Sequence, residues 1–181
     1  KEILARKKER IVLAKLGLPE EELKVKVEGL PPARPFIEAI NKPRQISLIA
    51  EIKEASPSEG VIREDFHHLA IAKAYADTNV QAISVLTEED FFKGNIAYIN
   101  EVKNLTTAPV LRKDFIIEPY QVYESRFYGA DAILLIAALL TQDELTQLSA
   151  LAYQLGMDAL VEVHNEKELK KVLKLKGMPL I

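Results

Sequence analysis

Apolar and polar residues follow two different periods along this chain. From residue 46 onward, short runs that are apolar throughout alternate with longer segments whose apolar residues recur every three or four positions. The first pattern is typical of strands buried on both faces, and the second of amphipathic helices. The predicted strands are residues 46–52, 82–87, 109–113, 131–136 and 158–163, and a sixth begins at residues 178–181. The predicted helices are residues 68–78, 96–105, 119–130, 141–156 and 165–177.

Local signals mark several of these helix boundaries. Thr141 and Glu144 have the spacing of a capping box, in which each side chain bonds to the other residue's backbone N–H. Asn165 is a candidate cap for the last helix. Gly129 and Gly156 stand where two helices should stop, since glycine readily takes the left-handed conformation found there.

The first 45 residues have a different character. Residues 1–16 have helical spacing, and residues 17–35 contain prolines at positions 19, 31, 32 and 35. Two short helices are predicted, around residues 20–25 and 36–42. We therefore divide the chain into an N-terminal helical extension, residues 1–45, and a barrel domain, residues 46–181.

The repetition of strand and helix predicts a parallel sheet covered by helices. Such a sheet is either open and doubly wound or closed into a barrel of eight units. An open sheet that binds a dinucleotide carries a glycine-rich turn after its first strand, whereas the turn here is EASPSEG and the chain has only 7 glycines. We therefore predict a (β/α)8 TIM barrel. The pattern covers about five of its eight units and the start of strand six, so we expect the chain to be truncated.

Composition narrows the possible functions. A hydrophobic content of 48% suffices for one sizeable core, and a net charge of −3 gives no sign of nucleic-acid binding. The chain has no cysteine, and its longest apolar run, residues 132–140, is too short to span a bilayer. His67, His68 and His164 lack the spacing of metal ligands. We expect a cytoplasmic protein with no membrane partner, metal or cofactor.

Charged residues stand at the carboxyl ends of three predicted strands. Glu51 and Lys53 end the first strand, Lys113 ends the third and Glu162 lies near the end of the fifth. In a barrel, reactive groups lie at this end of the strands. We predict that the four side chains converge on one barrel mouth, and that the third strand leaves the core at Arg112. The alternative is a set of structural Lys–Glu pairs that only tie strands together.

Four blocks of this sequence resemble indole-3-glycerol phosphate synthase, a barrel enzyme of tryptophan biosynthesis. They are residues 47–66, 83–94, 109–140 and 155–169, in the family's order and spacing. The motifs IAEIK-x-ASPS and PVLRKDFI-x-x-PYQ-x-YE are long and specific. The helical extension that precedes the first strand is also similar.

The resemblance implies a decarboxylating lyase. Its substrate is 1-(2-carboxyphenylamino)-1-deoxyribulose 5-phosphate, its product is indole-3-glycerol phosphate, and CO2 and water are lost. Lys113 matches the family's general acid and Glu162 its base. Lys53 and Glu51 match a pair linked to dehydration and to binding of the anionic substrate. The resemblance implies no cofactor, a small phosphorylated molecule as partner and a monomeric full-length protein.

The resemblance also implies substrate-binding positions. Phe92 and Phe115 match residues that flank the anthranilate ring, and Leu134 matches an apolar wall, although ordinary core packing explains Leu134 equally well. Ser56 and Ser58 lie in a segment that matches a mobile active-site loop, for which the alternative is a plain turn.

The sequence departs from the family at two places. Glu54 and Glu59 stand where basic residues are usual, and should weaken attraction of an anionic substrate. The family's later strands, with their phosphate-binding loops, are absent from these residues. A non-catalytic barrel fragment that needs its C-terminal part is therefore the second hypothesis. A different phosphosugar barrel, such as an isomerase, is a third, and it would leave the two lysines and two glutamates unexplained.

Overall fold

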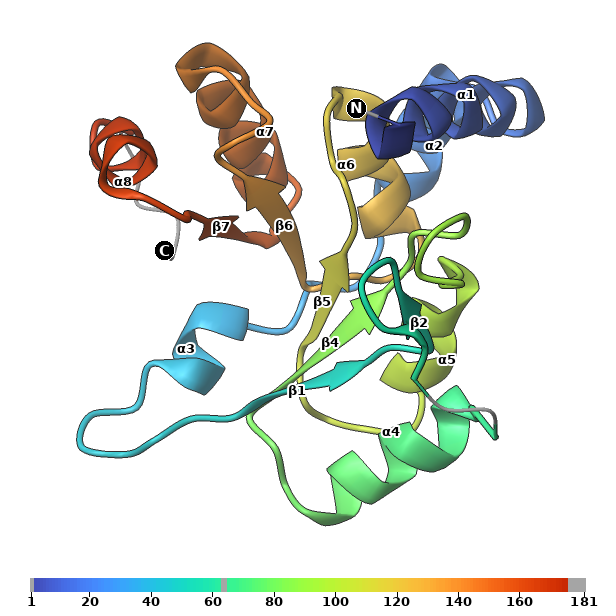
Figure 1. Cartoon of the computed structure of the whole chain (residues 1–181), viewed down its shortest axis with the longest axis vertical. Coiled ribbons are helices and arrows are strands. Elements are labelled where there is room, and N and C mark those ends of the chain that lie inside the picture. Colours follow the sequence, from blue (N-terminus) through green and yellow to red (C-terminus); the bar gives the residue numbers. More distant parts are fainter. Residues whose placement is uncertain (1, 63–64, 176–181) are drawn as a thin grey trace.

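The structure is a computed structural model that describes residues 2–62 and 65–175. Its centre is a five-stranded sheet in which every neighbouring pair is parallel (Figure 1). The strand order is β1-β4-β5-β6-β7, which is the order along the chain. The strands are β1 (Ile49–Ile52), β4 (Ala82–Leu86), β5 (Val110–Lys113), β6 (Ala132–Ile136) and β7 (Asp158–Glu162).

A helix follows each strand and packs outside the curved sheet (Figure 1). These helices are α4 (His68–Asp77), α5 (Ala97–Lys103), α6 (Pro119–Phe127), α7 (Gln142–Gln154) and α8 (Glu166–Val172). A doubly wound sheet would reverse its strand order at some point, whereas this order never reverses. The architecture is that of a TIM barrel, as predicted.

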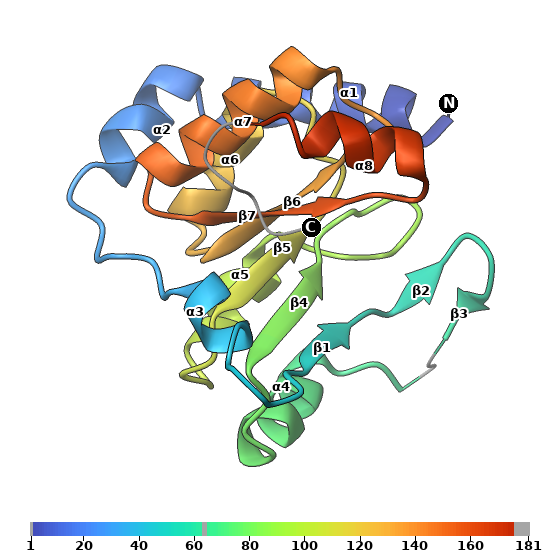
Figure 2. The same cartoon turned by 90° about the vertical axis from the view of Figure 1, so that its left-hand side faces the viewer.

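Alternation along the strands creates two cores. Residues that face outward, such as Ile52 and Val85, pack with the covering helices in the larger cluster. Residues that face inward, such as Leu111 and Leu134, pack with Phe36 in a smaller cluster. Phe36 begins α3 (Phe36–Ile40), which lies beside the amino ends of the strands (Figure 2). The opposite, carboxyl ends of the strands are thus the open side of the sheet.

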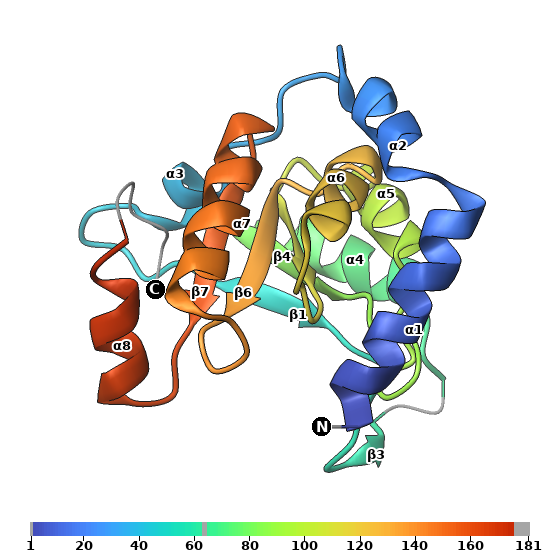
Figure 3. The same ribbon diagram turned by 90° about the horizontal axis from the view of Figure 1, so that it is seen from above.

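The N-terminal extension folds onto the barrel. Its first helices, α1 (Glu2–Gly17) and α2 (Glu20–Val27), lie on one side of α6, and α7 lies on the other (Figures 1 and 3). Ile11 and Leu23 are buried around Tyr120 of α6, whose hydroxyl donates to the Leu18 carbonyl at 3.1 Å. These contacts fix α1 against the barrel. The division of the chain at residue 45 stays a prediction.

Most predicted elements are confirmed, with shifted ends. The first strand begins at Ile49 rather than at Ile46, whose side chain is fully solvated. The last helix ends at Val172, and the predicted strand at residues 178–181 lies outside the described residues. A hairpin of β2 (Ala55–Ser56) and β3 (Gly60–Val61) was not predicted (Figure 2). Its strands have two residues each, too short to show an alternating pattern.

The predicted caps are present. Thr141 Oγ1 accepts from the Glu144 N–H at 3.2 Å, and the Glu144 carboxylate accepts from the Thr141 N–H at 2.7 Å. The hydrogen bond from the Thr141 N–H is the main reason why the pKa of Glu144 lies below its ordinary value. Asn165 caps α8 through its side-chain oxygen. Within the described residues, no helix combines the length and apolarity needed to cross a bilayer.

Candidate active site

A cavity of about 340 Å³ lies at the carboxyl ends of the strands. Glu51 from β1, Lys113 from β5 and Glu162 from β7 line it, together with Leu134 from β6. Each of these residues is at or near the end of its strand, so the parallel sheet brings them to one edge. Three of the four predicted catalytic residues therefore share one cavity.

Lys53 joins this group through Glu51. The Lys113 ammonium lies 2.6 Å from one Glu51 oxygen, and the Lys53 ammonium lies 3.4 Å from the other. The side chains of Lys113 and Glu51 keep 36% and 29% of their surface exposed. Because they are partly hydrated, a charged ligand can reach them without breaking a buried pair. Lys53 itself lines a neighbouring hollow next to α4.

Glu162 faces the two lysines across the mouth. One of its oxygens lies 3.1 Å from Nε2 of His164, which is exposed at the rim. Within the part of the chain that the structure describes, no group of three or more His, Asp or Glu side chains is placed to hold a metal ion. The mouth therefore presents two ammonium groups and two carboxylates to a ligand.

An aromatic pair borders the same mouth. Phe92 and Phe115 have ring centroids 6.2 Å apart and ring planes tilted by 48°. Both line a second cavity of about 220 Å³, which shares Lys113, Glu162 and Leu134 with the first. An apolar slot thus opens beside the charged groups. Leu134 serves both roles expected from the sequence, because it also packs in the inner core.

The loop after β1 is separate from this arrangement. Ser56 Oγ accepts from the Glu59 N–H at 3.2 Å and lies 3.3 Å from Ser58 Oγ, so the serines stabilise the hairpin turn. Ser56 is not among the described residues that line the two cavities, and neither are Glu54 and Glu59. The structure therefore does not bring Ser56 together with the other predicted residues.

The expectation for Arg112 was wrong. Arg112 does not reach the rim: it is 3% exposed and points to the helix side of the sheet. Its guanidinium bonds to a Glu124 oxygen at 2.8 Å, to Ser125 Oγ at 3.1 Å and to Asp114 at 3.0 Å. Side chains along a strand alternate between its faces. Among these charges, only Lys113 turns toward the mouth.

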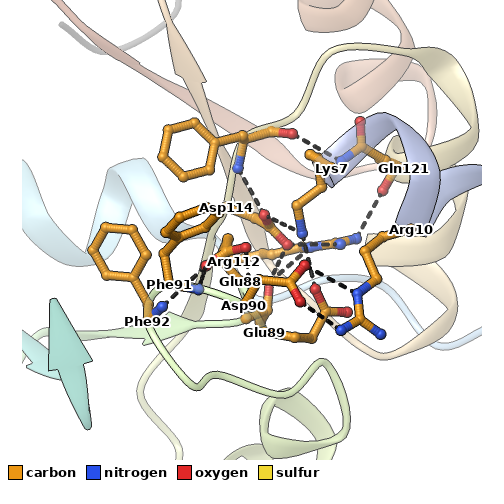
Figure 4. A network of polar contacts seen from close by, with 12 residues as sticks. Lys7, Arg10, Glu88, Glu89, Asp90, Phe91, Phe92, Arg112, Asp114 and Gln121 are labelled. Carbon is orange, nitrogen blue, oxygen red and sulfur yellow. Dashed lines mark hydrogen bonds and ion pairs between the residues drawn. The ribbon is translucent and has the colours of Figure 1, made fainter. Parts of the chain in front are cut away.

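Asp114 is the centre of a buried polar network (Figure 4). One oxygen accepts from the Phe115 N–H at 2.8 Å and lies 2.9 Å from the Lys7 ammonium of α1. The other accepts from Thr87 Oγ1 at 2.6 Å and from Arg112 at 3.0 Å. Burial alone would raise the pKa of Asp114, but the charges of Arg112 and Lys7 and the bond from Thr87 hold it below its ordinary value.

Lys7 has the complementary environment. Burial alone would lower the pKa of Lys7, but Asp114 and Glu89 together raise it above its ordinary value. Sequence reasoning missed Lys7, because it is only one of many charges in the first helix. One signal was available, because Lys7 is four residues before Ile11 and so lies on the buried stripe of α1.

The loop after β4 is held from the same helix (Figure 4). Buried Glu88 accepts hydrogen bonds from the N–H groups of Phe91 at 2.8 Å and Phe92 at 3.0 Å. Arg10 forms two hydrogen bonds to Asp90, at 2.6 and 3.0 Å. Residues 88–92 are thus folded around Glu88 and tied to α1.

Comparison with known proteins identifies relatives along the whole chain. The profile of a family described as indole-3-glycerol phosphate synthase matches residues 1–180. A protein of that name from Desulforamulus reducens is 48% identical over 171 residues, which are 94% of this chain and 64% of the relative. Another from Acetivibrio thermocellus is 47% identical over 174 residues, which are 95% of this chain and 67% of the relative. The chain spans about two thirds of the length of these relatives.

A solved structure supports the fold alone. The crystal structure of KGPDC from Streptococcus mutans, determined as a complex with a small ligand, superimposes with a TM-score of 0.51 at 9% identity. The match covers 68% of this chain and 56% of the other. At such low identity, a likeness of backbone carries no statement about chemistry.

Proposed function

Since the chain belongs to the indole-3-glycerol phosphate synthase family, we propose that its cavity closes the indole ring of indole-3-glycerol phosphate. One observation carries the proposal: Glu51, Lys113 and Glu162 line one cavity that borders the Phe92–Phe115 pair. The charged groups suit a reaction that moves protons, and the aromatic pair suits a substrate with an aryl ring.

The substrate is 1-(2-carboxyphenylamino)-1-deoxyribulose 5-phosphate. The ring carbon that carries the carboxylate attacks the ribulose carbonyl carbon, and a carbon–carbon bond forms. The bond to the carboxylate breaks and CO2 leaves, which restores the aromatic ring. The former carbonyl oxygen then leaves as water, while the adjacent methylene carbon loses a proton.

Lys113 is the general acid at the carbonyl oxygen. Its ammonium is held 2.6 Å from Glu51, so it is charged and oriented before the substrate arrives. As the carbonyl oxygen gains negative charge, this ammonium neutralises it and gives it a proton. The geometry that supports this role is the position of Lys113 in both cavities.

The other residues have complementary roles. Glu162, across the mouth, is the base that takes the methylene proton. Lys53 and Glu51 act as a pair, in which Lys53 attracts the anionic substrate and assists the loss of water. The aryl ring lies beside Phe92 and Phe115. Leu134 is the apolar wall, and Ser56 belongs to a loop that approaches only with substrate bound.

A second candidate function follows from the open sheet. Within the described residues, β1 and β7 are the two ends of the sheet and do not pair with each other. The chain also spans about two thirds of its relatives' length. The alternative is therefore a barrel unit that becomes catalytic only with a C-terminal part bound between these strands. That the full-length protein is monomeric and cytoplasmic also stays a prediction.

One assay tests both candidates. The 181-residue chain is incubated with the substrate, alone and mixed with the segment of the Acetivibrio thermocellus relative that lies beyond the match, and the fluorescence of the indole product is followed. Product from the chain alone supports the first candidate, and product only from the mixture supports the second. The segment alone and the Lys113→Ala chain are the controls. Absence of product from both preparations would contradict the proposed function.

A further inference from the structure

We propose that Lys7 is a positioning residue: it sets the separation of the Phe92 and Phe115 rings by tying together the two loops that carry them. The inference rests on the proposed function, because it assigns these rings the task of receiving the substrate's aryl group. Lys7 is not among the described residues that line either cavity, so it acts through others.

The first tie holds the loop after β5. Asp114 follows Lys113 directly, and its carboxylate accepts from the Phe115 N–H at 2.8 Å. The Phe115 carbonyl in turn accepts from Gln121 Nε2 at 2.9 Å. The backbone of Phe115 is therefore fixed on both sides, and its N–H bond is made to the same carboxylate that pairs with Lys7.

The second tie holds the loop after β4. The Lys7 ammonium lies 3.1 Å from a Glu89 oxygen. Glu89 is adjacent to Glu88, whose buried carboxylate accepts from the Phe92 N–H at 3.0 Å. A shift of Glu89 therefore shifts the turn that carries the Phe92 ring. One turn further along α1, Arg10 holds Asp90 of the same loop.

Lys7 is suited to join the two loops. It is 2% exposed, and its ammonium has three N–H donors for the two carboxylates at 2.9 and 3.1 Å. A buried charge is stable only where its partners are in place, so Lys7 keeps Asp114 and Glu89 at a fixed separation. Both rings follow these two carboxylates within one to three residues along the chain. Their separation of 6.2 Å thus depends on a side chain outside the barrel domain.

Fluorine NMR tests the inference without turnover. The chain contains 6 phenylalanines, and 4-fluorophenylalanine gives each a resonance that single Phe→Leu variants assign. In Lys7→Met, which has a similar length and no charge, we expect the resonances of Phe92 and Phe115 to shift or broaden. The resonance of Phe36, buried at the other end of the sheet, should stay in place. Lys8→Met, an exposed neighbour on α1, is the matched control and should change none of them.

Two further variants keep the test decisive. Arg10→Gln breaks only the tie to Asp90 and should move the Phe92 resonance while that of Phe115 stays. Lys7→Arg keeps the charge, and should move both resonances by less than Lys7→Met does; it replaces Lys7→Met if that variant does not fold. Unchanged Phe92 and Phe115 resonances in a folded Lys7 variant would overturn the inference.

Kinetics connect the rings to the substrate. With the preparation that makes product, Lys7→Met should raise KM about tenfold and change kcat less than about threefold, because ring binding is disturbed and the acid and base are not. A purely structural role for Lys7 predicts lower stability with both constants unchanged in the folded fraction, and that outcome would also overturn the inference. Shifted resonances in a protein that makes no product would refute the proposed function and leave the positioning role intact.

Discussion

Three consecutive residues of one strand end belong to two different charge systems. Arg112 and Asp114 point to the helix side, where both are 3% exposed and bonded to Glu124, Thr87 and Lys7. Lys113 points to the mouth, where its side chain is 36% exposed. The alternation of side chains on a strand is the whole cause of the difference.

The comparison separates charges that hold the fold from charges that meet a ligand. In the buried network every charge has a charged partner, so removing one partner strands another in a medium where it is poorly solvated. At the mouth, water replaces a lost partner, so stability depends little on the pairing. The same exposure leaves the mouth's charges available to a substrate.

Replacing Lys113 should have the largest effect on activity. Lys113→Ala removes the general acid, and turnover should fall by about two to four orders of magnitude. Stability should change by less than about 1 kcal/mol, because the pair with Glu51 is partly exposed. Single-turnover kinetics and urea unfolding measure the two quantities. Near-normal turnover in this variant would show that the acid lies elsewhere.

Replacing Asp114 should have the largest effect on stability. Asp114→Asn keeps the size of the side chain but leaves Arg112 and Lys7 short of a negative charge, so the free energy of unfolding should fall by about 3–5 kcal/mol. Glu162→Gln, at the mouth, is the matched control and should lose less than about 1 kcal/mol. Equal losses in the two variants, measured by urea unfolding, would erase the distinction between the two charge systems.

Acid should act on the two systems differently. The pKa of Asp114 is lower in the folded protein than in the unfolded chain, so the unfolded chain binds the proton first as pH falls. The contribution of Asp114 is therefore present above about pH 4 and is lost as pH falls toward its folded pKa, with a slope of up to about 1.4 kcal/mol per pH unit. Unfolding titrations from pH 5 to about 2.5 should show this slope in the wild type and not in Asp114→Asn.

The matched comparison for this titration is Glu144→Gln, which removes a carboxylate whose pKa is also lowered, at the cap of α7. That variant should keep the Asp114 slope. If Asp114→Asn and the wild type lost stability in parallel below pH 4, the buried pairing of Asp114 would contribute no acid-dependent stability.

The sequence predicted the barrel and its mouth because both follow from short-range periodicity. Strands with apolar faces, caps such as Thr141 and charges at three strand ends are all visible in windows of about ten residues. Once the strands are parallel, Glu51, Lys113 and Glu162 must reach the same edge. The prediction for the mouth thus needed only the strand pattern and the alternation of faces.

The buried network could not be predicted in the same way. Lys7 and Asp114 are more than one hundred residues apart, and only the docking of α1 brings them together. Arg112 was misplaced because a run of charges suggests exposure, whereas here alternate charges are buried against a helix. The hairpin after β1, with two residues in each strand, is set by a turn rather than by an apolar pattern.

The smallest expected effect concerns two charges that belong to neither system. Glu54 and Glu59 are close to the mouth in sequence, but they are not among the described residues that line the cavities. Glu54→Lys combined with Glu59→Lys replaces two negative charges by two positive ones, and should lower KM at low salt by about twofold through long-range attraction of the anionic substrate. The value of kcat should not change.

Salt separates this effect from direct contact. At about 0.5 M salt the screening length is a few ångströms, so the double variant and the wild type should have the same KM. The matched control is a double variant at Glu166 and Lys167 of α8 that exchanges their charges and leaves the sum unchanged. A drop in KM that persists at high salt would mean that position 54 or 59 touches the substrate. The hairpin would then belong to the mouth, and the division between structural and ligand-facing charges would have to include it.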